Sequence, residues 1–271
     1  MSGPEGTGAG PVDTTAANPG GVKPVDAPGA DAGGARPVDT TGALPATDDA
    51  GRAAAAEEAE RAAAGDRPRG LLIDFGGVLT SNVFEAFGDF AAAEGLERDA
   101  VADLFRTDRE ARGLLKDLES GAIDTAAFGP PFAAKAGLAP ERAEGIVTRM
   151  FSALRPDEAM GAAVRAARAA GIRTGLISNS WGDGMVYDDA LLAEAFDAVV
   201  LSHEVRLRKP APEIFTIGAE RIGLPPEACV FVDDLPFNLP PAEALGMQTV
   251  LHRSAEETVP ALEALFGVPL R

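Results

Sequence analysis

The sequence predicts an α/β protein whose doubly wound parallel sheet carries a small all-helical insertion after its first strand. Short apolar runs without polar alternation are typical of strands that are buried on both faces. Five such runs occur, at residues 71–73, 172–178, 198–202, 229–233 and 248–251. From Glu158 onward they alternate with helical patterns, which indicates parallel strands joined by helices. From Asn82 to about Arg155 the periodicity is helical without a convincing strand, so this stretch is the insertion.

The amino-terminal residues 1–66 predict a disordered tail that ends in a fraying, alanine-rich helix. Residues 1–50 have almost no large apolar side chains, so they cannot bury enough surface to offset the entropy lost on ordering. The triplet Pro-Val-Asp begins at Pro11, Pro24 and Pro37, a spacing too short for a solenoid repeat. We interpret the tail as a low-complexity spacer, with a docking or modification segment as the alternative.

The folded region begins near Gly70 with the strand Leu71–Ile73. We expect a core built from residues 70–81 and 156–271, because the strands fall in these two stretches. Its helices are expected at Glu158–Ala170, Glu213–Ile222 and Ala242–Leu245. Residues 82–155 would form a separate helical domain above the carboxyl ends of the strands, as a cap.

Composition restricts the partners and the compartment. The net charge of −18 over 271 residues argues against non-specific binding to nucleic acid or to an anionic membrane, because both are polyanions. No apolar segment has the length of a bilayer span, and the amino terminus lacks the basic start and apolar core of a secretory signal. We therefore expect a cytoplasmic protein without nucleic-acid or membrane partners, and the sequence leaves its oligomeric state open.

Few residues are available for a soft metal site. Cys229 is the only cysteine, which excludes an intrachain disulfide and argues against a zinc site built from thiolates. His203 and His252 are the only histidines, too few for a histidine-rich metal site. Hard oxygen ligands are the option that remains.

Polar side chains gather at the carboxyl ends of the predicted strands. They are Asp74 at the first strand, Ser178 and Asn179 at the second, and Asp233 and Asp234 at the fourth, and Lys209 precedes a helix that begins with proline. Taken singly, each has an ordinary explanation as a turn, cap or surface residue. Together they would meet at one edge of the sheet, where unpaired carboxylates repel one another. A divalent cation would relieve that repulsion, and an all-oxygen ligand set suits Mg²⁺.

Four segments resemble, in order and spacing, the motifs of the haloacid dehalogenase superfamily. They are residues 74–80 (Asp-Phe-Gly-Gly-Val-Leu-Thr), Ser178-Asn179, Lys209-Pro210, and Asp233-Asp234 with Asn238. The resemblance covers about residues 70–266 and is greatest to phosphatases related to the amino-terminal domain of soluble epoxide hydrolase. It implies a Rossmann-like core, a helical cap and a small phosphorylated substrate.

The resemblance also implies a metal site at the strand ends. Mg²⁺ would be held by the side chains of Asp74 and Asp234 and by the backbone carbonyl of Gly76. Asp233 would act directly or through water, and Asn238 would steady the outer shell of the metal.

The resemblance further assigns the chemical roles. Asp74 would attack phosphorus and form an aspartyl-phosphate intermediate. Ser178 and the backbone around Asn179 would donate hydrogen bonds to a phosphoryl oxygen, and Lys209 would neutralise phosphoryl charge.

One position departs from the family pattern. Most phosphatases of the superfamily have a second aspartate two residues after the nucleophile, as general acid and base, and here that residue is Gly76. A phosphatase that tolerates the loss is the leading interpretation, and a phosphate-binding protein with weak catalysis is the alternative. A 2-haloacid dehalogenase is a further alternative, but that branch works without metal and usually lacks the paired acids Asp233 and Asp234.

Other residues near the predicted site have weaker signals. The aromatic residues Phe84, Phe87 and Phe90 fall at helical spacing and favour the core of the cap over substrate contacts. Trp181 and Tyr187 follow the second motif and are expected at the mouth of the pocket. Three arginines could reach a second anionic group, although a solvated helix face explains them better: Arg106, Arg109 and Arg112.

Overall fold

The computed structural model describes residues 65, 67–182, 187 and 189–271. All of these residues belong to one compact unit, residues 50–271. The predicted tail, with its Pro-Val-Asp repeat, lies outside the described residues except for Gly65.

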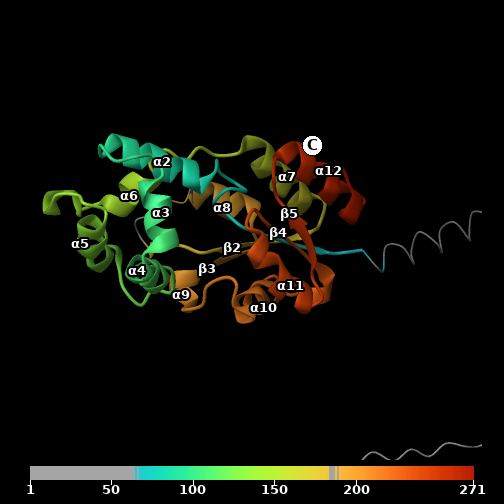
Figure 1. Ribbon diagram of the computed structural model, residues 1–271. Coiled ribbons are helices and arrows are strands. Elements are labelled where there is room, and N and C mark those ends of the chain that lie inside the picture. Colours follow the sequence, from blue (N-terminus) through green and yellow to red (C-terminus); the bar gives the residue numbers. More distant parts are fainter. Residues whose placement is uncertain (1–64, 66, 183–186, 188) are drawn as a thin grey trace, which may run out of the picture. The chain divides into compact units, whose positions relative to one another are not determined.

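A single parallel sheet of five strands forms the centre of this unit (Figure 1). The strands are β1 (Gly70–Ile73), β2 (Arg173–Ser178), β3 (Ala198–Leu201), β4 (Cys229–Asp233) and β5 (Gln248–Leu251). Their order in the sheet is β3-β2-β1-β4-β5, so β1 is the central strand. Ile73 pairs with Leu176 of β2 and with Val232 of β4, which brings the carboxyl ends of three strands to one edge. The predicted doubly wound parallel sheet is confirmed.

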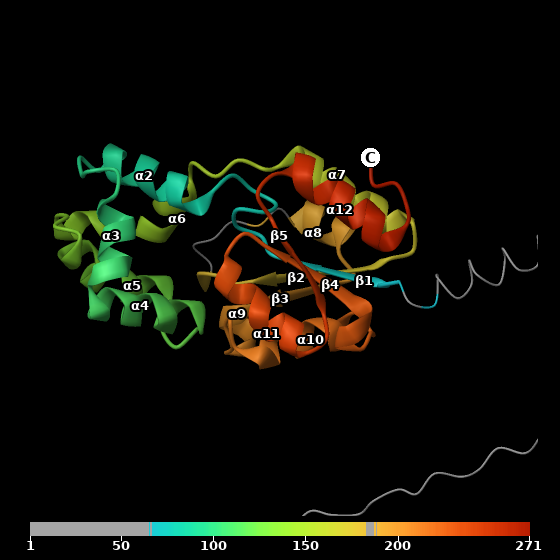
Figure 2. The same ribbon diagram turned by 45° about the vertical axis from the view of Figure 1, so that its right-hand side comes forward.

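Helices cover both faces of the sheet (Figure 2). On one face lie α7 (Glu158–Ala169), α8 (Asp189–Ala195) and α12 (Ala255–Phe266), and on the other α10 (Pro212–Arg221) and α11 (Leu239–Ala244). Leu71 and Ile73 belong to the core on the α7 side, whereas Leu72 belongs to the core on the α10 side. Alternate residues of β1 are therefore buried on opposite faces, which explains the apolar run without polar alternation.

Residues 82–155, here called the helical block, are inserted between β1 and α7. The block contains α2 (Val83–Ala93), α3 (Ala100–Thr107), α4 (Arg109–Glu119), α5 (Thr125–Lys135), the 3₁₀ turn η1 (Pro140–Arg142) and α6 (Ile146–Phe151). The side chains of Asn82, Asp108 and Asp124 accept hydrogen bonds from the first turns of α2, α4 and α5, so these caps fix where the helices begin. The two segments that connect the block to the core lie side by side, joined by an antiparallel β-bridge between Thr80 and Pro156. The block lies beside the carboxyl ends of the strands (Figures 1 and 2).

Several element boundaries differ from the sequence prediction, most of them by one residue. The strand predicted to end at Ser202 ends at Leu201, because Ser202 begins the short helix α9 (Ser202–Val205) and its hydroxyl bonds the carbonyl of Glu119. The second strand begins at Arg173 rather than Ile172. The helix predicted over 242–245 begins at Leu239, since prolines at the start of a helix cost no hydrogen bond. Helices α8 and α12 lie in stretches where no helix was predicted, and short 3₁₀ turns occupy η3 (Pro226–Ala228) and η4 (Pro236–Asn238).

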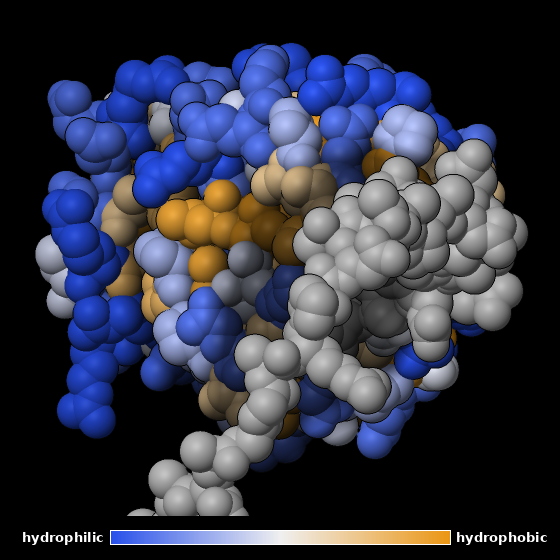
Figure 3. All heavy atoms as spheres, turned by 90° about the vertical axis from the view of Figure 1, so that its right-hand side faces the viewer, coloured by the Kyte–Doolittle hydropathy of each residue, from blue (hydrophilic) through white to orange (hydrophobic). Residues whose placement is uncertain are grey.

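The visible part of the face that points away from the helical block is mainly hydrophilic. Figure 3 views the molecule from that side and shows one area of hydrophobic side chains among hydrophilic ones. Among the described residues, no helix has the length and hydropathy needed to cross a bilayer.

Candidate active site

Asp74 lies directly after β1, at the carboxyl edge of the sheet. Its N–H donates to the carbonyl of Val232 at 2.9 Å, which extends the parallel ladder by one residue and fixes the backbone. Its Oδ1 accepts the N–H of Phe75 at 2.7 Å and lies 2.7 Å from Nζ of Lys209. The residue is only 7% exposed, so its carboxylate is held in place and shielded from water.

Lys209 bridges two carboxylates although it is almost fully buried. Its Nζ lies 2.7 Å from Oδ1 of Asp74 and 2.7 Å from Oδ2 of Asp233. Asn179 fixes its backbone from both sides: Lys209 N–H donates to Oδ1 of Asn179 at 2.8 Å, and Nδ2 of Asn179 donates to the Lys209 carbonyl at 3.1 Å. The ammonium also lies 5.5 Å from the ring centre of Phe231. The predicted site residues Asn179 and Lys209 thus form one connected unit.

The paired acids at the end of β4 have different surroundings. Asp233 is fully buried and accepts the N–H of Leu235 at 2.9 Å and Nδ2 of Asn238 at 3.0 and 3.1 Å. Asp234, in contrast, has a buried Oδ1 with no hydrogen-bond partner among the described residues. Its Oδ2 approaches Gly77 so closely that a Cβ there would lie 2.3 Å away, and Gly77 has φ +79°. Glycine is therefore required at 77.

The three carboxylates could hold a metal ion together. One oxygen from each of Asp74, Asp233 and Asp234 lies within 4.8 Å of the others. Burial raises the pKa of Asp74 to about 7, against the opposing charge of Lys209. Burial and the neighbouring Asp233 raise the pKa of Asp234 to about 6. Three clustered carboxylates repel one another, and Oδ1 of Asp234 has no hydrogen-bond partner among the described residues. Such a set of oxygen ligands fits a hard cation such as Mg²⁺.

The charge on Lys209 is maintained by its neighbours. Burial opposes the ammonium form, but the carboxylates of Asp74 and Asp233 outweigh that effect and raise the pKa of Lys209 above its ordinary value. The residue is therefore a permanent cation beside the carboxylate of Asp74 at neutral pH.

Ser178 meets a partner that was expected only at the pocket mouth. Its Oγ lies 3.0 Å from the hydroxyl of Tyr187, and either oxygen can be the donor. The Tyr187 ring lies 4.6 Å from that of Phe75, the residue after Asp74. Burial raises the pKa of Tyr187, and the Ser178 hydrogen bond opposes this effect, so the phenol is neutral and able to donate. Tyr187 thus belongs to the inner site.

Gly76 faces a neighbour from the helical block. A Cβ at this position would lie 2.7 Å from Cγ2 of Val83, at the start of α2. A β-branched side chain within a helix has little rotamer freedom, so Val83 would have to shift to admit any side chain at 76. The space that a side chain at position 76 would need is therefore occupied by Val83.

A cavity of about 580 Å³ lies over these residues, between the sheet edge and the helical block. Its polar part includes Asp74, Ser178, Asn179, Lys209, Asp234 and Asn238. Much of the remainder is apolar and includes Val83, Phe84, Phe87, Phe105, Leu115, Phe151, Trp181, Leu235 and Phe237. Phe84 and Phe237 are 54% and 58% exposed, although both are large and apolar. An unusual exposure of two aromatic rings at one cavity indicates a binding surface.

The predictions for the aromatic and basic residues were correct in part. Phe90 is a core residue as expected, and Phe87 is buried but also lines the cavity. Phe84 was expected in the core and is instead exposed, because its position on α2 faces the cavity. Of the three arginines only Arg106 lines this cavity. Trp181 lines it as expected.

Sequence reasoning missed one polar pair in the same cavity. Oε2 of Glu119, the last residue of α4, lies 2.5 Å from Nε of Arg208. The two residues are 89 positions apart, and neither falls in a motif, so no local pattern could have joined them.

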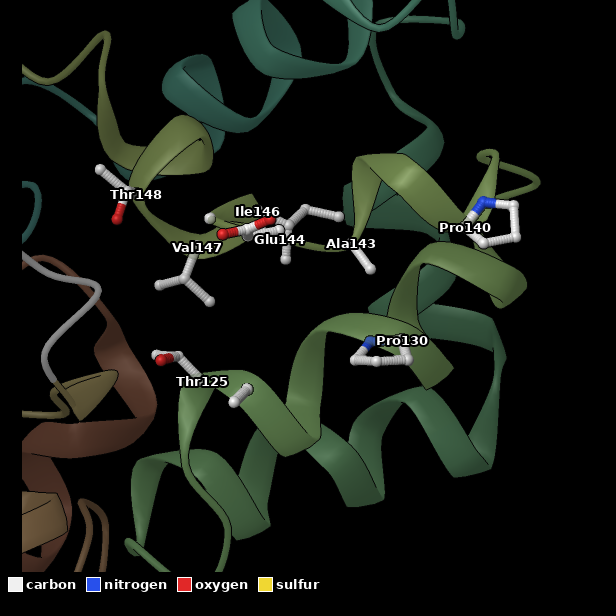
Figure 4. A pocket seen from close by; sticks show the side chains of 10 residues that line it. Thr125, Pro130, Pro140, Ala143, Glu144, Ile146, Val147 and Thr148 are labelled. Atoms are coloured by element: carbon white, nitrogen blue, oxygen red, sulfur yellow. The ribbon is translucent and has the colours of Figure 1, made fainter.

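A second cavity, of about 500 Å³, lies within the helical block (Figure 4). Figure 4 shows Thr125 and Pro130 of α5 on one side and Glu144, Ile146 and Val147 on the other. Glu144 is the only titratable residue among those that line it. A lone carboxylate is no catalytic constellation, so the chemistry is expected at the sheet edge.

A family comparison matches most of the described chain. Residues 68–246 match the family described as haloacid dehalogenase-like hydrolase. The matched stretch includes all the predicted site residues, from Asp74 to Asn238.

Two curated relatives resemble parts of the chain. Bifunctional epoxide hydrolase 2 of Rattus norvegicus is 30% identical over 128 residues, which are 45% of this chain and 23% of the relative. Fructose-1-phosphate phosphatase YqaB of Escherichia coli is 42% identical over 67 residues, which are 23% of this chain and 36% of the relative. The chain thus spans well under half the length of either relative.

A solved structure resembles the fold. It is a variant of a haloacid dehalogenase (HAD) family enzyme from Bacteroides thetaiotaomicron in complex with magnesium and inorganic phosphate. The similarity has a TM-score of 0.52 at 23% identity and covers 69% of this chain and 94% of that chain. At this identity the likeness concerns the fold.

Proposed function

Since this chain belongs to the family of haloacid dehalogenase-like hydrolases, we propose that it is a Mg²⁺-dependent phosphatase that acts on small phosphate monoesters. The observation that carries the proposal is the arrangement around Asp74: a fixed, buried carboxylate 2.7 Å from a permanent cation and beside two further acids. The relative from Escherichia coli is a fructose-1-phosphate phosphatase, which favours a phosphorylated small molecule as substrate.

The proposed metal ligands are the side chains of Asp74 and Asp234 and the backbone carbonyl of Gly76. The unpartnered Oδ1 of Asp234 supports this assignment, because a buried carboxylate oxygen without a donor is costly unless a cation meets it. Asp233 would act directly or through water, and Asn238 orients it through the hydrogen bonds to both oxygens. When bound, Mg²⁺ supplies positive charge that offsets the carboxylates and the phosphoryl oxygens.

In the proposed reaction Asp74 is the nucleophile. Its free carboxylate oxygen forms a bond to phosphorus while the bond from phosphorus to the ester oxygen breaks, and the leaving group takes a proton from water. Water then attacks the aspartyl phosphate, which releases inorganic phosphate and restores the carboxylate. Lys209 neutralises charge on the phosphoryl group, and Ser178 and the backbone near Asn179 donate hydrogen bonds to it. The bond between Ser178 and Tyr187 orients the serine hydroxyl for that role.

The helical block would act as a cap that excludes water from the site. Because Gly76 offers no proton, esters with good leaving groups are expected to react fastest. The apolar lining favours an ester whose leaving group is largely apolar or aromatic.

A binding protein with little turnover is the second candidate, favoured by Val83 in the place of a general acid. A dehalogenase is less favoured, because the pair Asp233 and Asp234 would remain without a cation in a metal-free enzyme.

The test is phosphate release from p-nitrophenyl phosphate with and without Mg²⁺. We expect Mg²⁺-dependent turnover that Asp74→Asn abolishes. Asp99→Asn is the matched control, since Asp99 is exposed and makes no side-chain cap bond. Undiminished turnover by Asp74→Asn would refute the nucleophile, and phosphate binding without turnover would favour the binding protein.

A further inference from the structure

The ion pair of Glu119 and Arg208 joins the helical block to the core inside the substrate cavity. Both residues line the cavity that holds Asp74. The side chain of Glu119 is 9% exposed and that of Arg208 is 28% exposed. The backbone carbonyl of Glu119 also accepts a hydrogen bond from the hydroxyl of Ser202. The carboxylate is therefore a rigid anchor.

Arg208 uses only one edge of its guanidinium in this pair. Nε donates to Oε2 of Glu119, and neither terminal nitrogen has a hydrogen-bond partner among residues 65, 67–182, 187 and 189–271. A guanidinium offers five donors in a planar fork, and its two terminal nitrogens match the two oxygens of a carboxylate or phosphate. The anchored Nε leaves that fork free in a cavity that is otherwise mostly apolar.

The phosphoryl end of the cavity already has its own cation. Lys209 contacts Asp74 and Asp233 there, whereas Arg208 is tied to the helical block. A single phosphoryl group at Asp74 therefore does not account for the fork of Arg208.

We propose that Arg208, anchored by Glu119, is a specificity-determining residue that binds a second oxyanion of the substrate, apart from the phosphoryl group at Asp74. This inference rests on the proposed phosphatase site and names its substrate class: phosphate monoesters with an apolar body that also carry a carboxylate or another oxyanion. Pre-ordering by Glu119 lowers the entropy that Arg208 loses when it binds such a group.

The test measures binding rather than turnover, with phosphonates that the enzyme cannot hydrolyse. Phenylphosphonate and its 2-, 3- and 4-carboxy derivatives are titrated calorimetrically into the Mg²⁺-loaded protein. The three isomers place the carboxylate at different distances from the phosphonate. We expect one isomer to bind the wild-type protein at least about tenfold more tightly than phenylphosphonate, the factor expected of one charge-assisted hydrogen bond.

Two variants of Arg208 and one control complete the test. Arg208→Gln should remove the preference for the carboxylated isomer, and Arg208→Lys should reduce it because the fork is lost. Arg106→Gln, which removes the other arginine of the cavity, should keep the preference. A role of Arg208 limited to neutralising Glu119 would lower binding of all four ligands equally.

The inference is overturned if no isomer binds the wild-type protein more tightly than phenylphosphonate, or if Arg106→Gln removes the preference and Arg208→Gln does not. Failure of the proposed function appears separately, as absent turnover of p-nitrophenyl phosphate. A preference without turnover would keep the specificity site and reject the phosphatase. Turnover without a preference would support the phosphatase and reject the specificity site.

Discussion

The sheet edge and the helical block face the same cavity but are built by different rules. At the sheet edge, backbone pairing of β1 with β4 fixes Asp74 beside Asp233. In the block, the side chains that reach the cavity come from helices whose positions depend on packing, as for Phe87, whose ring centre lies 5.6 Å from that of Trp181. Under the proposed function, the edge would hold the reacting groups with little freedom, and the block would add the apolar lining whose position depends on packing.

The largest effect is expected when the sheet edge alone is disturbed. Gly77→Ala would place a Cβ against Asp234 and is expected to lower Mg²⁺-dependent activity by about ten- to a hundredfold, the loss typical of residues that support a metal ligand. Gly95→Ala is the matched control, because Gly95 has φ +78° and no atom within 4 Å of its Cβ position. Both variants carry the same backbone strain, so equal activity losses would contradict a special role of the sheet edge.

The pH dependence of stability tests the clustered charge at the edge. Asp74 and Asp234 have pKa values of about 7 and about 6 in the folded chain, above the ordinary 3.8. The folded state therefore binds protons at these two groups more tightly than the unfolded state does. The free energy of unfolding of the metal-free protein should then decrease as the pH rises from about 4 to about 7. Mg²⁺ should restore it, and its effect on the melting temperature should be larger at pH 8 than at pH 5.

The expected effect of Mg²⁺ at pH 8 is a shift of a few degrees in the melting temperature. About 1 kcal/mol corresponds to about 2–4 °C in a domain of this size. Asp234→Asn should raise the metal-free melting temperature at pH 8 and remove most of the Mg²⁺ effect. An equal Mg²⁺ effect at both pH values would count against a metal site at these acids.

The boundary between the two regions lies at Gly76 and Val83. Gly76→Asp alone should destabilise the protein, because its Cβ meets Val83. The double variant Gly76→Asp/Val83→Ala provides both a carboxyl group and the space for it. It should raise the ratio of the rate on alkyl phosphates to the rate on p-nitrophenyl phosphate by about tenfold or more. The ratio of the two rates is the measurement, and Val83→Ala alone is the control. An unchanged ratio would show that the missing general acid does not limit the reaction.

The smallest effect is expected at the aromatic lining of the cavity. Phe84→Ala and Phe237→Ala remove half-exposed rings, so they should raise KM for aryl phosphates about fivefold and leave kcat nearly unchanged. Thermal stability should hardly change, because neither ring is a core residue. A fall in kcat with constant KM would place these rings in the chemistry instead of in binding.

The residues of the sheet edge could be predicted from sequence because topology determines where strands end. Asp74, Ser178 and Asp233 each end or follow an apolar run, and parallel pairing brings such ends together whatever the helices do. The residues that contact these side chains could not be predicted in the same way. Tyr187 reaches Ser178 from a stretch without a periodic pattern, and Val83 fills the space beside Gly76 through packing.

The helical block could be predicted as helices, but its inward faces could not. Its periodicity gave the extent of the insertion, yet the same spacing fits Phe90 in the core and Phe84 in the cavity. The contact of Glu119 with Arg208 spans 89 positions and depends on how α4 meets the core. Long-range contacts of this kind depend on the assembled fold and have no local signature.

The proposed mechanism requires that Asp74 is phosphorylated during turnover. Mass spectrometry of the protein, after acid quenching during turnover of a phosphate ester with Mg²⁺, measures this step. We predict one added phosphoryl group on the peptide that contains Asp74, absent without Mg²⁺ and absent in Asp74→Asn. Continued phosphate release with no phosphorylated Asp74 peptide, or with the group on another residue, would contradict the mechanism.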